Sequence, residues 1–119
     1  MKKSERMIHT LDATDQAPGR LASHIAHLLI GKHKASFAPN VDNGDTVAVV
    51  NAAKLRLTGK KMEQKEYYHH TMYPKGLKTE HARSVFADDP SDMIRRAVSR
   101  MLPKNTHRTE RLKRLTITN

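Results

Sequence analysis

Residues 46–52 read TVAVVNA, and the first five of them are all β-branched or alanine. Such continuous apolarity is typical of a strand that is covered on both faces, as the strands of parallel sheets are. Upstream, residues 7–13 (MIHTLDA) have the character of a short strand. Between the two, apolar residues recur at helical spacing in residues 20–30, and Gly31 follows where such a helix would end. Strand, helix and strand in this order predict a βαβ unit.

The remaining elements are predicted from shorter patterns. Residues 65–71 and the alternating residues 115–117 indicate two more strands. Helices are expected at 79–86 and 92–102, and Pro103 would end the second of them. The sequence therefore predicts one α/β domain over residues 1–119, built on a small, mostly parallel four-stranded sheet with basic loop and C-terminal extensions.

Positive charge is the main feature of the composition. The 119 residues include 22 Lys and Arg against 12 Asp and Glu, which gives a net charge of +10 and an isoelectric point near 10.2. Residues 54–78 hold seven basic and two acidic side chains, and residues 95–119 hold eight and one. Clustered cations on a small domain are typical of a protein with a polyanionic partner. A basic surface that only maintains solubility is the simpler alternative, although solubility is usually achieved with mixed charges.

The composition disfavours secreted and membrane proteins. The chain has no cysteine, so disulfides and thiolate metal sites are excluded. Residues 1–13 lack the apolar run of a secretory signal, and no stretch is long and apolar enough to span a membrane. A soluble intracellular protein is expected.

Neither a metal site nor an active site is indicated by the sequence. His69 and His70 are neighbours, so on a strand they point to opposite faces and cannot share one ion. His24 and His27 share a helix face without a third ligand at a known spacing, and they are expected to be ordinary exposed residues. Gly19 is a single glycine where a dinucleotide fingerprint has three, and the chain has no phosphate-loop motif or serine nucleophile elbow. No catalytic residue, cofactor, metal or small-molecule substrate is therefore expected.

The stretch YYHHTMYPKGLK, residues 67–78, concentrates the residue types that bind RNA. It holds all three tyrosines together with two histidines and two lysines, around one proline and one glycine. Lys and Arg neutralise phosphates, His and Tyr bind the backbone or stack on exposed bases, and Pro and Gly shape a projecting loop. On a strand, one of Tyr67 and Tyr68 should be buried and the other exposed. The chain has too few aromatic rings for a sheet that stacks several bases, so recognition of RNA shape and backbone is expected.

Six segments of the chain occur together in a characteristic order. They are GRLAS (19–23), GKHK (31–34), VDNGDTVAVVNAAK (41–54), TGKK (58–61), KEYYHHTMYPKGLK (65–78) and AVSRMLPKN (97–105). In this order and spacing, the chain resembles the bacterial form of the large-subunit ribosomal protein 13 family. The resemblance implies a three-layer α/β/α sandwich around a small parallel sheet. It also implies a protein that binds large-subunit rRNA early in subunit assembly and has no catalytic activity.

The chain departs from the family pattern at a few places. Lys75 stands where the family usually has glycine, and Arg100 stands where a small residue is common. Both ends are shorter than in typical bacterial members, so contacts made by longer tails are not expected here.

The candidate RNA-binding residues come from the two basic blocks and the GKHK segment. They are Lys32, His33, Lys34, Arg56, Lys60, Lys61, Tyr68, His70, Tyr73, Lys75, Lys78, Arg96, Arg100, Lys104, Arg108, Arg111 and Lys113. Arg95 and Arg114 extend the same C-terminal cationic stripe. The acids Asp88, Asp89 and Asp92 are interpreted as favourable charges at a helix N-terminus, or as a contact for a basic neighbouring protein.

The expected partners are large-subunit rRNA and neighbouring large-subunit ribosomal proteins, in the cytoplasm. A DNA- or RNA-binding regulator that acts outside any particle is the leading alternative, and charge alone does not separate the two. A nucleotide-dependent enzyme is a further alternative, which tight binding of a nucleotide to the purified protein would reveal.

Overall fold

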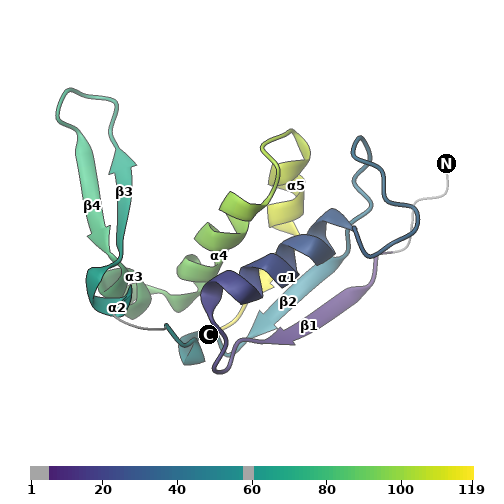
Figure 1. Cartoon of the computed structure of the whole chain (residues 1–119), viewed down its shortest axis with the longest axis horizontal. Coiled ribbons are helices and arrows are strands. Elements are labelled where there is room, and N and C mark those ends of the chain that lie inside the picture. The colour runs from purple at the N-terminus through teal and green to yellow at the C-terminus, as the bar shows by residue number, and fades with distance from the viewer. Residues whose placement is uncertain (1–5, 58–60) are drawn as a thin grey trace.

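The computed structural model describes residues 6–57 and 61–119, and it contains a parallel sheet and a separate hairpin (Figure 1). The parallel sheet has the strand order β1-β2-β5, with β1 at Ile8–Asp12, β2 at Thr46–Val50 and β5 at Leu115–Ile117. The antiparallel hairpin consists of β3 (Glu66–His70) and β4 (Leu77–His81). The helices are α1 (Pro18–Ile30), α2 (Lys61–Gln64), α3 (Ala82–Asp88), α4 (Pro90–Met101) and α5 (His107–Lys113), and a 3-10 turn, η1, covers Ala52–Lys54.

The βαβ unit predicted from the first half of the chain is confirmed. Strands β1 and β2 pair in parallel from Ile8 opposite Thr46 to Asp12 opposite Val50, and α1 connects them. Gly31 ends α1 in the left-handed conformation, with φ 88°, and its N–H donates to a carbonyl of the last turn at 3.1 Å. Glycine suits this position because it adopts positive φ without the steric cost of a Cβ.

The prediction of a four-stranded sheet is wrong, because one of the four predicted strands belongs to a separate hairpin. The strand expected at 65–71 forms as β3, but it pairs with β4 and not with the parallel sheet, which has three strands in the described residues. Residues 79–81, which were expected to begin a helix, are extended because each of them pairs with a residue of β3. The helix begins only at Ala82. Cross-strand pairing therefore overrides the local helical pattern at this point.

The described part of the chain builds two layers. Helices α1 and α4 pack against each other, and α1 lies along one face of the parallel sheet (Figure 1). Val47 and Val49 of β2 are fully buried beneath the helices, whereas Ile8 of β1 is 74% exposed on the outer face. The three-layer sandwich implied by the resemblance is not formed by these residues, because none of the described helices covers the outer face of the sheet.

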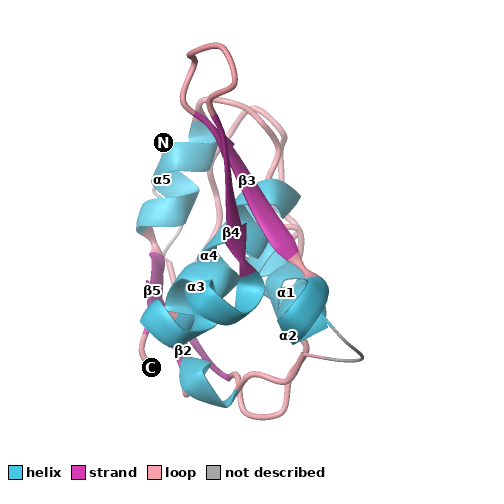
Figure 2. Cartoon of the chain, turned by 90° about the vertical axis from the view of Figure 1, so that its left-hand side faces the viewer, coloured by secondary structure: helices cyan, strands magenta, loops and turns pink. Residues whose placement is uncertain are grey.

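Two apolar clusters hold the molecule together. The larger lies between the parallel sheet, α1 and α4. Its fully buried members include Ile25, Leu29, Val47, Val49 and Val98, and the half-buried Ala97 packs at its edge. The smaller cluster consists of Tyr67, Ala82, Val85 and Met93. It fixes the foot of the hairpin against α3 and α4, while the hairpin tip projects beyond them (Figure 2).

Candidate nucleic-acid interface

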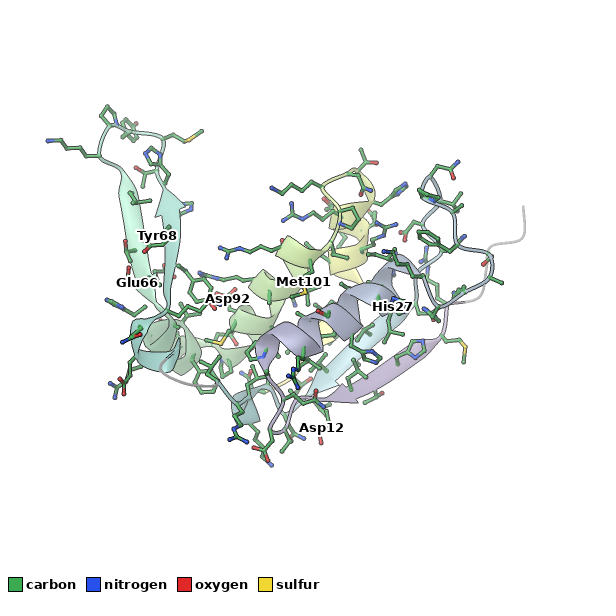
Figure 3. All side chains as sticks on the ribbon, in the orientation of Figure 1. Asp12, His27, Glu66, Tyr68, Asp92 and Met101 are labelled. Atoms are coloured by element: carbon green, nitrogen blue, oxygen red, sulfur yellow. The ribbon has the colours of Figure 1, made fainter. Side chains whose placement is uncertain are left out.

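The hairpin presents the Tyr- and His-rich stretch in an alternating pattern. Tyr67 is 6% exposed and Tyr68 is 61% exposed, which confirms that one ring is buried and the other faces solvent. The Tyr68 hydroxyl donates to the Glu66 carboxylate at 3.0 Å, and this bond raises the pKa of Tyr68 above its usual value (Figure 3). The His70 ring accepts the N–H of Met72 through Nδ1 at 2.9 Å, which orients the imidazole at the end of β3.

The hairpin tip is held by its backbone and exposes its side chains. The Thr71 N–H donates to the Gly76 carbonyl at 2.8 Å, and the Gly76 N–H donates to the Tyr73 carbonyl at 2.9 Å. Glycine suits position 76, because a Cβ there would lie 2.8 Å from the Tyr73 carbonyl oxygen and 2.0 Å from the Thr71 Oγ1. Lys75 has a φ of 59°, a left-handed conformation that favours glycine over lysine. Met72 and Tyr73 are 89% and 76% exposed, so the tip offers these side chains to a partner and not to the core.

Two arginines of α4 face the foot of the hairpin. Arg96 pairs with Asp92 at 2.9 Å and with Glu80 at 3.2 Å, and its guanidinium carbon lies 4.9 Å from the centre of the Tyr67 ring. Arg100 is exposed, lies 5.9 Å from the same ring centre, and has no ion pair with the residues that the structure describes. The ring quadrupole stabilises cations in these positions.

Two of the three acids predicted at a helix N-terminus, Asp89 and Asp92, lie at the N-terminus of α4. The Asp89 carboxylate accepts the N–H of Ser91 at 3.0 Å and caps the helix, and Asp92 lies in its first turn. The bond from the Ser91 hydroxyl is the main cause that lowers the pKa of Asp89. Asp88 is the last residue of α3 and is exposed.

Three arginines of the predicted C-terminal cationic stripe are engaged within the molecule. Arg111 is only 1% exposed, and its Nε lies 3.5 Å from the Asp42 carboxylate. Arg114 pairs with the same carboxylate and donates to a carbonyl in the last turn of α1 at 2.9 Å. Burial acts to raise the pKa of Asp42, but the bond from Arg114 outweighs it and the pKa is lowered. Arg108 donates to the Ser99 hydroxyl.

The prediction that placed Arg111 on an exposed stripe is therefore wrong. Its guanidinium is enclosed, because it compensates the Asp42 carboxylate between α5 and the loop after α1. Lys104 and Lys113 are exposed as expected, although Lys113 lies 3.5 Å from Glu110.

Asp45 is a fully buried carboxylate that accepts four hydrogen bonds. Its Oδ2 accepts from Nε2 of His9 at 2.7 Å and from Nε2 of His33 at 2.8 Å. Its Oδ1 binds the Lys34 ammonium at 2.6 Å and accepts the Met7 N–H at 3.2 Å. Burial acts to raise the pKa of Asp45, but the bonds from Lys34, His9 and His33 outweigh it and hold the pKa well below its usual range. We call Asp45, His9, His33 and Lys34 the Asp45 cluster.

The Asp45 cluster changes the interpretation of the GKHK segment. His33 and Lys34 hold the loop after α1 to β1 and β2, whereas Lys32 is exposed. The cluster also brings ligand-type atoms of His9, His33 and Asp45 within 4.8 Å of one another. The N···O separations are those of hydrogen bonds, and the Lys34 ammonium beside the carboxylate opposes a second cation. The geometry is that of a hydrogen-bonded anchor, which sequence analysis missed because His9 and Asp45 are 36 residues apart.

The remaining candidate residues lie on the surface or outside the described part. Arg56, Lys75 and Lys78 are exposed, and so are His24 and His27, as predicted for ordinary surface histidines. Lys60 lies outside the described residues, as does the side chain of Lys61 at the start of α2. No helix in the described ranges is both long and apolar enough to cross a membrane.

Comparison with known proteins identifies the family of the chain. The family model for ribosomal protein L13 matches residues 6–118. The chain belongs to the ribosomal protein L13 family. It is 50% identical over 113 residues to the large ribosomal subunit protein uL13 of Aquifex aeolicus, an alignment that covers 95% of this chain and 78% of that relative.

Other L13-family relatives match over the same extent. The uL13 protein of Desulfovibrio desulfuricans is 49% identical over 116 residues, covering 98% of this chain and 81% of the relative. The uL13 protein of Micrococcus luteus is 46% identical over 114 residues, covering 96% and 78%. The family assignment made from the six sequence segments is confirmed. Since L13-family proteins are structural and non-enzymatic, the chain is a ribosomal protein without a catalytic role.

Proposed function

We propose that this protein binds large-subunit rRNA as a structural component of the large ribosomal subunit in the cytoplasm, and that it supports early subunit assembly. The observation that carries this function is a set of exposed cations without ion pairs among the described residues: Lys32, Arg56, Lys75, Lys78, Arg100 and Lys104. Uncompensated surface cations attract a polyanion and release its counterions on binding. The exposed Tyr68, His70 and Tyr73 on the hairpin add groups that bind the backbone or stack on bases.

Salt dependence tests this electrostatic mechanism. If about six phosphates are neutralised, the affinity for large-subunit rRNA falls by roughly three decades between about 50 and 200 mM salt. Filter binding of the purified protein to the rRNA measures this slope. A nearly flat dependence would contradict the mechanism.

Fractionation of cell lysate by size separates the ribosomal role from a free regulator. A ribosomal component co-migrates with large subunits, whereas a regulator migrates with free RNA or with DNA. Depletion of the protein tests the assembly role, since an early assembly protein leaves incomplete large-subunit precursors when it is missing. Accumulation of complete subunits after depletion would exclude that role.

Neighbouring large-subunit proteins are the second class of proposed partner. Asp88 and Asp89 line a depression beside α3 together with Glu80 and Asp92, which pair with Arg96. The charge of Asp88 and Asp89 is complementary to a basic segment of a neighbour.

A further inference from the structure

A concave space lies between the foot of the hairpin and α4. It has a volume of about 200 Å³, and Leu57, Met93, Ala97 and Met101 form its apolar wall. The space is smaller than the roughly 300–1,000 Å³ of sites for drug-sized ligands. It adjoins a wider groove of about 850 Å³ that runs past Arg56. We call the two together the α4 groove. Figure 3 shows Met101 on α4, across from the hairpin strand that carries Tyr68.

The rim of the α4 groove is positively charged. Lys65 Nζ lies 5.5 Å from the centre of the Tyr67 ring, and Arg100 approaches the same ring. Arg96 also lines the space, but Asp92 and Glu80 neutralise it. Lys65 and Arg100 have no such partner among residues 6–57 and 61–119, so they leave a net positive charge at the opening.

The combination of an apolar wall and a cationic rim restricts the ligand. A phosphate alone would use the cations and leave the methionine and leucine side chains in water. An unpaired nucleotide satisfies both, because its base offers a flat apolar face and its phosphate carries the charge. Methionine side chains adapt to flat aromatic surfaces, and arginine guanidinium planes stack on unpaired bases. A base inside a duplex cannot enter, since its faces are already stacked on its neighbours.

We propose that the α4 groove seats one unpaired nucleotide of the bound RNA. The base lies against Met93, Ala97 and Met101, and the phosphate lies between Lys65 and Arg100. This role rests on the proposed rRNA binding and adds to it a preference for single-stranded over duplex RNA.

Variants of the groove test this preference with three RNA probes at one salt concentration. The probes are complete large-subunit rRNA, a short single-stranded oligonucleotide and a duplex of the same length. Ala97→Trp fills the apolar space and Arg100→Gln removes a rim cation. The control Thr10→Trp adds the same ring at an exposed position of β1, away from the groove.

The expected result is a loss of about tenfold in affinity of Ala97→Trp for the single strand, as for one lost stacked base, with a change below about twofold for the duplex. Arg100→Gln should show the same selectivity, and Thr10→Trp should bind all probes as the parent does. Because Arg100 is exposed and unpaired, its variant gives the answer even if Ala97→Trp fails to fold.

Three outcomes would overturn the inference. The first is that Arg100→Gln binds the single strand as well as the parent does. The second is that the variants lose equal affinity for the single strand and the duplex. In both cases retained rRNA binding would leave the proposed function intact. Failure of the parent itself to bind rRNA would overturn the proposed function and the role of the groove together.

Discussion

Replacing Asp45 with asparagine tests how the loop after α1 is held to the parallel sheet. The carboxylate is fully buried, and two oxygens accept four donors, from His9, His33, Lys34 and the Met7 backbone. Asparagine has the same shape but replaces one acceptor oxygen with a donating NH2 group. If the amide nitrogen faces the Lys34 ammonium and the Met7 N–H, both of these donors face another donor. If it faces His9 and His33, each imidazole must change tautomer and accept through Nε2, so the two donated bonds of the parent are lost.

The loss of stability follows from this geometry. The variant loses the charge-assisted bond with Lys34, which costs about 1.5–3 kcal/mol, and a buried donor that is left unsatisfied costs about 1–3 kcal/mol. Since Lys34 retains some exposure and its ammonium can reach water, we expect a net destabilisation of about 3 kcal/mol. That is a large part of the roughly 5–15 kcal/mol that stabilises a typical domain.

The dependence on pH provides a second test of the same carboxylate. The pKa of Asp45 is lower in the folded than in the unfolded protein, so its contribution is fully present above the ordinary pKa of 3.8. It is lost as the pH falls below that value towards the folded pKa. The difference in stability between parent and Asp45→Asn should therefore be smaller at pH 3 than at pH 5.

Urea unfolding followed by circular dichroism measures both effects. Asp88→Asn is the matched control, because Asp88 is exposed and has no ion pair within the described residues, and it should be as stable as the parent. If Asp45→Asn is as stable as the parent, or if the difference persists unchanged into acid, then the Asp45 cluster does not anchor the loop.

Three further predictions concern the hairpin and the absence of a metal requirement. The triple variant His70→Ala, Tyr73→Ala, Lys75→Ala removes exposed side chains, so it should keep its melting temperature while its rRNA binding weakens. The control Val49→Ala, in the buried strand, should instead lose about 2 kcal/mol of stability and keep its affinity for rRNA when folded. Lys75→Gly should raise stability by about 1 kcal/mol, because glycine adopts the positive φ without strain, and lower thermal stability of this variant would refute that. Circular dichroism should be unchanged by a chelator, and loss of structure would reveal a metal in the Asp45 cluster.

The βαβ core could be predicted because its signals are local. The five apolar residues of β2, the helical spacing in α1 and the glycine after it each restrict the backbone within a few residues. The pairing of β3 could not be predicted in this way, because nothing in residues 65–71 specifies whether the parallel sheet or β4 supplies the partner. The turn around Gly76 decides it, by bringing residues 77–81 alongside β3.

The sequence predicts which residues of the candidate interface are basic, but a lysine that binds phosphate and one that binds a buried carboxylate look alike in sequence. Asp42 and Asp45 of the VDNGD segment decide which of the basic residues are used inside the protein. They hold Lys34, Arg111 and Arg114 through contacts that span up to 72 residues of chain. These contacts engage two acids and three bases, so most of the net charge remains and is carried by fewer outward cations. The outward cations that remain include those of the hairpin, of α4 and its C-terminal end, and Lys32 and Arg56, and an RNA that binds the protein by charge should approach from these elements.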